Sequence, residues 1–138
     1  MSYGNQFKAH TQLKLSPFFK RTSKLNESQE WRRWSGYLAA TNYELTHENE
    51  YFAIRTKAAL LDITPLYKYI IEGPDAQRFL NRMVTRNIGI CKVGQVMYTP
   101  WCDEDGKQID DGTVQRLSDH KFRITSAEPN LEWIEYNA

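Results

Sequence analysis

The chain has 138 residues, the length of one ordinary domain. Hydrophobic residues make up 41% and charged residues 25% of it, proportions that are typical of globular proteins and argue against a disordered chain. The net charge of +1 creates no overall field that would attract nucleic acid or an anionic membrane. Basic residues concentrate in residues 1–33 and acidic residues in residues 101–138, which favours internal charge complementarity over a nucleic-acid role.

The sequence pattern contains no metal, disulfide or membrane signature. Cys91 and Cys102 form no CxxC pair and the three histidines are scattered, so we expect no metal site and no disulfide scaffold. The N-terminus lacks the apolar core of a signal peptide, and the longest apolar run, residues 58–61, is too short to span a bilayer. We therefore expect a cytoplasmic protein with neither nucleic acid nor membrane among its partners.

The first predicted elements are an extended arm and a short helix. Residues 1–25 show no clear period, and a proline at position 17 disfavours helix just before it. A helix is predicted over residues 26–34, with Trp31 and Trp34 three apart on one face and Gly36 at its end.

A second helix is predicted to begin near Thr46, where early glutamates suit the positive end of the helix dipole. Four apolar residues recur at helical spacing and predict a stripe that faces the core. They are Tyr51, Ile54, Ala58 and Leu61. Leu60–Thr64 is then predicted to be a strand that stops at Pro65.

The rest of the chain alternates in the manner of half-buried strands, interrupted by a short helix. A Gly-Pro-Asp turn at residues 73–75 precedes an amphipathic helix over residues 76–84, and Asp105-Gly106 is a tight-turn signal. A last helix is predicted after Pro129. The predicted strands are Tyr67–Glu72, Gln95–Trp101, Lys107–Leu117 and Lys121–Ser126. This order of elements predicts an α+β fold.

Two adjacent aspartates are unusual because they fall inside a predicted strand, where aspartate is disfavoured. Successive strand side chains point to opposite faces, so one of Asp110 and Asp111 should face inward and the other outward. A buried carboxylate must be paired, hydrogen-bonded or functional. Spacing alone names no reaction for this pair.

Residues 51–130 carry several spaced segments in one order. They are Ala53-Ile-Arg-Thr-Lys-Ala-Ala-Leu-Leu-Asp-Ile-Thr, Gly73-Pro-Asp-Ala, Phe79-Leu80, Val93-Gly-Gln-Val-Met-Tyr98, Asp105-Gly106 and Ile109-Asp110-Asp111 followed by Val114. Together they resemble the N-terminal portion of the glycine-cleavage T-protein (aminomethyltransferase) family, which includes folate-dependent demethylases.

The resemblance implies one ββαβββα-like unit of a folate-binding domain, with an antiparallel or mixed sheet and helices on one face. It divides the chain into an arm and short helix, residues 1–45, and the first half of that domain, residues 46–138. The family's chains are considerably longer, so we expect a truncated domain that is inactive alone and self-associates through the surface left exposed.

The resemblance also assigns candidate site residues and a cofactor. Asp111 matches the family's key carboxylate, which lies against tetrahydrofolate and offsets positive charge in the transition state. Tyr98 matches a folate-contacting aromatic residue, with a core tyrosine as the plainer interpretation. Thr113 would line the same wall as Asp111, and Leu66 matches an apolar position against the folate ring. No metal is required, because the cofactor holds the reactive nitrogen.

The predicted function is a tetrahydrofolate-dependent transfer of an aminomethyl or methyl group from a small amine or methylated donor. Two departures leave the donor open. The family pattern has Ser-His-Met where this chain has residues 64–66, and Asp-Asp-Leu where it has residues 110–112. A lipoyl carrier protein is one partner that the resemblance allows. The alternative is a non-catalytic folate-binding protein of the iron–sulfur cluster maintenance type, against which the paired aspartates argue.

Overall fold

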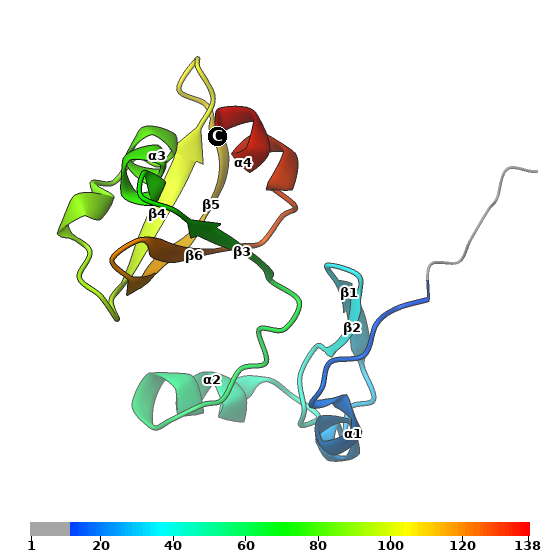
Figure 1. Ribbon diagram of the computed structural model, residues 1–138. Helices are drawn as coiled ribbons and strands as arrows, with labels where there is room; N and C mark the ends of the chain where they lie inside the picture. The colour runs from blue at the N-terminus through cyan, green and yellow to red at the C-terminus, as the bar shows by residue number, and fades with distance from the viewer. Residues whose placement is uncertain (1–11) are drawn as a thin grey trace, which may run out of the picture. The chain divides into compact units, whose positions relative to one another are not determined.

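The computed structural model describes residues 12–138 and divides the chain into two compact units, before and after the Pro65–Leu66 bond (Figure 1). This division falls later in the chain than the boundary predicted at residue 45. We describe each unit by itself. The N-terminal unit comprises the described residues 12–65, and the C-terminal unit comprises residues 66–138.

The N-terminal unit holds short elements and one two-stranded sheet. These are α1 (Phe19–Thr22), the 3₁₀-helix η1 (Ser23–Leu25), β1 (Trp31–Trp34), β2 (Tyr37–Ala40) and α2 (Glu48–Thr56). The strands β1 and β2 are antiparallel partners. The extended arm predicted over residues 1–25 is therefore wrong where α1 and η1 form, and its first eleven residues lie outside the described part of the chain.

The helix predicted over residues 26–34 is wrong, because β1 occupies its second half. Asn26 is buried, and its Oδ1 accepts hydrogen bonds from the Gln29 backbone N–H at 2.9 Å and the Ser28 hydroxyl at 2.8 Å. Such local bonds offer the backbone an alternative to helix. Ser35 and Gly36 both have positive φ, +46° and +81°, which is the two-residue turn that joins hairpin strands.

The second predicted helix is present as α2, but its apolar stripe does not face a core. No residue of α2 is buried, and Tyr51 and Ile54 are 52% and 68% exposed. The strand predicted over Leu60–Thr64 is also wrong. The Asp62 carboxylate accepts the Thr64 backbone N–H at 3.0 Å and its hydroxyl at 2.6 Å, so a local turn forms where a sheet ladder was expected.

The C-terminal unit is a four-stranded antiparallel sheet with two α-helices. Its elements are β3 (Tyr67–Glu72), α3 (Ala76–Met83), the 3₁₀-helix η2 (Ile88–Ile90), β4 (Val96–Cys102), β5 (Gln108–Ser118), β6 (Lys121–Ser126) and α4 (Leu131–Asn137). The strand order across the sheet is β3-β6-β5-β4. The predicted α+β class is confirmed, and the order βαβββα lacks only the first strand of the expected unit.

One face of this sheet packs against α3 and α4, which lie on the same side of it (Figure 1). The core is built from alternate residues of the strands and from the apolar sides of the helices. Its buried members are Ala76, Leu80, Met83, Val84, Ile88, Cys91, Trp101, Val114, Phe122, Ile124 and Ile134. The opposite face carries no helix of this unit, and residues such as Ile70 and Tyr98 are about half exposed there.

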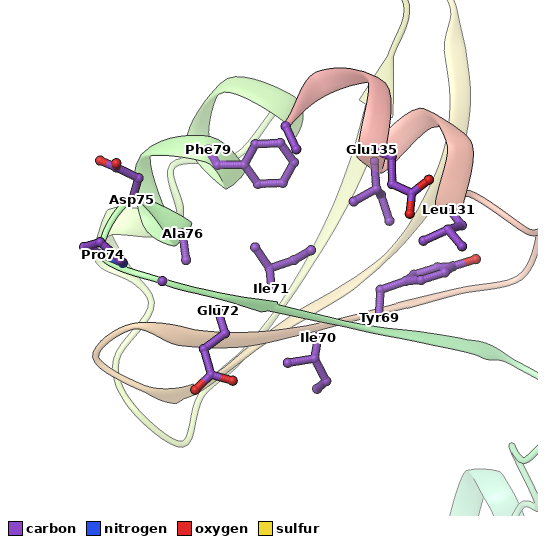
Figure 2. A pocket seen from close by; sticks show the side chains of 13 residues that line it. Tyr69, Ile70, Ile71, Glu72, Pro74, Asp75, Ala76, Phe79, Leu131 and Glu135 are labelled. Atoms are coloured by element: carbon purple, nitrogen blue, oxygen red, sulfur yellow. The ribbon is translucent and has the colours of Figure 1, made fainter.

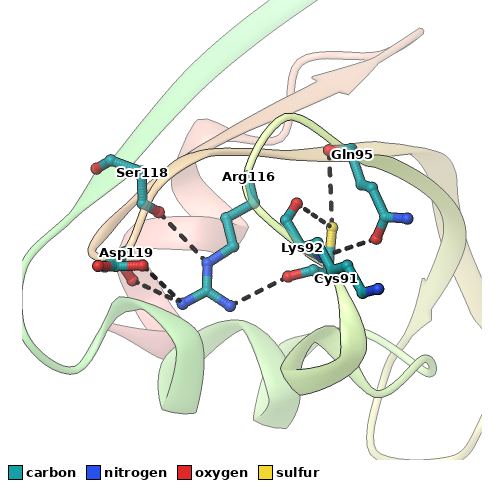
Figure 3. A network of polar contacts seen from close by, with 6 residues as sticks. All are labelled: Cys91, Lys92, Gln95, Arg116, Ser118 and Asp119. Atoms are coloured by element: carbon teal, nitrogen blue, oxygen red, sulfur yellow. Dashed lines mark hydrogen bonds and ion pairs between the residues drawn. The ribbon is translucent and has the colours of Figure 1, made fainter.

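Arg116 connects the loop before β4 with the turn between β5 and β6, at one end of the sheet (Figure 3). Its guanidinium donates hydrogen bonds to the backbone carbonyls of Cys91, Ser118 and Asp119 at 3.1, 3.4 and 3.1 Å. The same group lies over the ring of Phe122, 5.4 Å from its centroid. Because these donors are satisfied by backbone carbonyls, the Arg116 cluster has a structural role and offers no binding site.

Candidate functional site

The two adjacent aspartates point to opposite faces of the sheet, as the strand alternation predicts. Asp110 points toward the helical side, where its Oδ2 accepts the Asn130 side-chain amide at 2.7 Å and the Glu128 backbone N–H at 3.3 Å. Asp111 lies on the face without helices, next to Tyr98. The carboxylate carried over from the family resemblance therefore lies on the sheet face that no helix of this unit covers.

Both carboxylate oxygens of Asp111 accept a hydrogen bond. The Tyr98 hydroxyl donates to Oδ2 at 2.9 Å, and the Gln108 side-chain amide donates to Oδ1 at 3.2 Å. A carboxylate has about four lone-pair positions, so further donors have room at each oxygen. The arrangement is a partly exposed negative charge in a defined orientation, suited to a cationic or amine-bearing ligand.

The backbone of Asp111 is held from the core side. The Asp111 N–H donates to Asp110 Oδ1 at 2.8 Å, and Asp110 is itself held by Asn130. Asn130 is buried and also accepts from the indole of Trp101 at 3.4 Å, while its backbone N–H donates to the Tyr69 hydroxyl at 2.8 Å. One buried residue thus connects β3 through its backbone N–H, and β4 and β5 through its side-chain amide, on the core side of Asp111.

Thr113 lies directly opposite Tyr98 in the β4–β5 register. The register continues from Thr113 to Thr125 on β6 and to Lys68 on β3. Leu66 immediately precedes β3, at the far side of the sheet from Tyr98. A ligand that touched both Leu66 and Tyr98 would have to extend across roughly 14 Å, because β3 and β4 are three strand spacings apart.

The hydrogen bond to Asp111 raises the pKa of the Tyr98 hydroxyl, with smaller contributions from desolvation and from the charge of Asp111. We expect Asp111→Asn to lower this pKa toward about 10, the value of an unperturbed tyrosine. Since the folded-state pKa lies above the unfolded one, the contact stabilises the fold at neutral pH, and this contribution is lost as the pH rises through the raised pKa.

An ultraviolet difference titration, with Tyr98→Phe as the reference, isolates this one tyrosine from the others. Asp105→Asn is the control, because Asp105 is an exposed turn residue ion-paired with Lys107 at 3.0 Å. An unchanged Tyr98 titration in Asp111→Asn would contradict the contact.

A hollow of about 570 Å³ lies elsewhere, at the free edge of β3 beneath α3 and α4 (Figure 2). Tyr69 and Ile71 point into it from β3, while Ile70 and Glu72 point to the other side of the sheet (Figure 2). The lining is mainly apolar, and the Glu72 carboxylate is ion-paired with Lys121 at 2.8 Å. The hollow contains none of the predicted site residues.

Within residues 12–138, no group of three histidine, cysteine, aspartate or glutamate side chains is placed to hold a metal ion. Over the same residues, none of the helices combines the length and the apolar character that crossing a membrane requires.

Gln108 is a site residue that the sequence analysis missed. Regular alternation would place residues 108 and 111 on opposite faces. A β-bulge interrupts the register between Trp101 and Cys102, so that Asp110 pairs with Trp101 and Gln108 pairs with Cys102. Ile109 is the additional residue. A bulge is not recognisable in the alternation of the sequence, because it depends on how the partner strand is aligned.

Comparison with known proteins supports one family. Residues 18–138 match the family described as GCVT N-terminal domain. An aminomethyltransferase of Halothermothrix orenii is 31% identical over 131 residues, which cover 91% of this chain and 36% of that protein. A trimethylamine-oxide aldolase of Ruegeria pomeroyi is 42% identical over 90 residues, which cover 64% of this chain and 11% of that protein.

The solved structure of the glycine cleavage system aminomethyltransferase T from Bartonella henselae has the same fold. It matches with a TM-score of 0.78 and 25% sequence identity, over 91% of this chain and 36% of that one. The chain therefore spans about a third of the length of the aminomethyltransferases that it resembles. The family match over residues 18–138, the relatives and the shared fold agree, and the chain belongs to the GCVT N-terminal domain family, that of the aminomethyltransferases and related one-carbon enzymes.

Proposed function

We propose that this chain contributes one wall of a tetrahydrofolate-dependent one-carbon transferase in which Asp111 is the catalytic carboxylate. The observation that carries the proposal is the orientation of Asp111, held by Tyr98 and Gln108 on the sheet face that carries no helix of its unit. Preorganised charge of this kind stabilises positive charge that develops at a reacting nitrogen, without the cost of reorienting solvent.

The residues present fit a reduced folate in two respects. The exposed ring of Tyr98 offers a flat apolar surface for an aromatic or pterin ring. Asp111 keeps lone pairs free to accept from ring or amine N–H groups beside that surface. Tetrahydrofolate would supply the nitrogen that receives the one-carbon unit. Thr113 and Leu66 would contact the bound cofactor along the same face.

The donor we propose is a small amine. An amine that carries positive charge is the chemistry that a fixed carboxylate recognises most directly. The similarity to an aminomethyltransferase and to a trimethylamine-oxide aldolase supports this class, with an aminomethyl or a methyl carbon as the transferred group. A lipoyl carrier protein would be a partner in the aminomethyl case only.

Calorimetric titration of tetrahydrofolate into the chain tests the proposal. We expect saturable binding that weakens by at least about tenfold in Asp111→Asn, because a charge-assisted hydrogen bond is worth about 1.5–3 kcal/mol. Asp105→Asn, which changes an exposed turn carboxylate, should bind as the unsubstituted chain does. Equal affinity in all three proteins would contradict the catalytic role of Asp111 and favour a folate-binding protein that performs no transfer.

A further inference from the structure

Gln108 occupies its place only because the strand is irregular. Three residues separate it from Asp111, a spacing that in a regular strand would put the two side chains on opposite faces. The bulge at Ile109, opposite Trp101 and Cys102, adds one residue and turns Gln108 to the face of Asp111. Bulges that re-aim a side chain in this way are frequent beside active sites.

The result of this irregularity is a direct contact. The Gln108 Nε2 donates to Asp111 Oδ1 at 3.2 Å, on the oxygen that Tyr98 does not use. One donor on each oxygen, from two different residues, restricts rotation of the side chain about its Cα–Cβ bond, whereas a single donor leaves more of that rotation open. The amide is neutral, so it orients the carboxylate without offsetting its negative charge. A lysine or arginine in the same place would offset that charge.

We propose that Gln108 is a positioning residue that, together with Tyr98, holds the Asp111 side chain in one rotamer for its role in one-carbon transfer. The role of Asp111 in this inference rests on the proposed function. The orientation of Asp111 by Gln108 does not depend on that function. Gln108 acts through Asp111 and need not touch substrate or cofactor. Its loss should therefore disorder Asp111 without removing the carboxylate.

The test compares Gln108→Leu with Gln115→Leu in the full 138-residue chain. Gln115 is a matched control, because it is a glutamine on the same strand whose side chain contacts Arg123 rather than Asp111. Nuclear magnetic resonance couplings between the α- and β-protons of Asp111, and from its carboxyl carbon to the backbone nitrogen, report whether its side chain keeps one rotamer. A side chain in one rotamer gives unequal couplings, and an averaged one gives nearly equal couplings.

We expect unequal couplings in the unsubstituted chain and in Gln115→Leu, and averaged couplings in Gln108→Leu. Tetrahydrofolate affinity should fall about fivefold in Gln108→Leu, as expected for loss of one hydrogen bond that orders the site. Couplings that stay the same in Gln108→Leu would overturn the positioning role. If the couplings respond while no variant binds tetrahydrofolate, the positioning role is supported and the proposed function fails instead.

Discussion

Replacing Asn130 with alanine is expected to lower the free energy of unfolding of the C-terminal unit by about 3 kcal/mol. Asn130 is 5% exposed, and its side chain donates to Asp110 at 2.7 Å. Without it, the indole N–H of Trp101, which is also buried, loses its acceptor, and Asp110 loses its closest donor. A buried N–H left without a partner costs about 1–3 kcal/mol, and Asp110, which keeps the backbone donors of Asp111 and Glu128, loses one charge-assisted hydrogen bond.

Amide hydrogen exchange in β5 and β6 is a suitable measurement, because it reports the opening of this unit separately from the rest of the chain. The matched control is Asn137→Ala. Asn137 lies at the end of α4, and its side chain donates only to the Trp133 carbonyl at 2.8 Å. We expect that control to cost less than about 1 kcal/mol. An equal decrease in the free energy of unfolding for the two alanine variants would show that Asn130 does not connect the strands of the sheet.

The second large effect is expected at Gly112, where alanine should lower the free energy of unfolding by about 3 kcal/mol. A Cβ atom at this position would lie 2.1 Å from the backbone carbonyl oxygen of Thr125 and 3.3 Å from the Cα of Ser126. Because these are backbone atoms of the neighbouring strand, no rotamer change relieves the contact. Strands β5 and β6 would have to separate beside Asp111.

Gly106→Ala is the informative comparison. Gly106 has φ +79° and open space where a Cβ would be, so alanine there costs only the left-handed backbone conformation, about 1–2 kcal/mol. Chemical denaturation of both variants measures how far each substitution lowers the free energy of unfolding. A Gly112→Ala protein as stable as Gly106→Ala would mean that the two strands separate easily. The close approach also accounts for glycine where the family pattern favours leucine, since leucine would require a different spacing of β5 and β6.

The local sequence determined most of the C-terminal unit. The strand β3, the helix α3 and the three strands β4, β5 and β6 all form within one or two residues of their predicted bounds. Here alternation, the Asp105-Gly106 turn and the apolar side of α3 agree with one another. The opposite orientations of Asp110 and Asp111 also follow from alternation alone, although the sequence did not tell which of them faces inward.

Elements were predicted wrongly where local signals compete. Trp31 and Trp34 suit a helix face by spacing, yet the two-residue turn at Ser35-Gly36 and the side-chain bonds of Asn26 produce a hairpin. At Thr64, the backbone N–H donates a hydrogen bond to the Asp62 carboxylate instead of to a neighbouring strand. In both places a nearby side chain accepts a hydrogen bond from a backbone N–H group. Such local hydrogen bonds cannot be recognised from the spacing of apolar residues.

The sequence by itself determined the family resemblance, the alternating strands and, through that resemblance, Asp111 as the candidate carboxylate. Only the tertiary structure decided how that carboxylate is held. The bulge at Ile109 brings Gln108 to Asp111, and the buried amide of Asn130 reaches Asp110 from a segment twenty residues along the chain. Both depend on the alignment of separate strands and on packing between distant segments. A local pattern does not encode these, because they arise only when the whole sheet assembles.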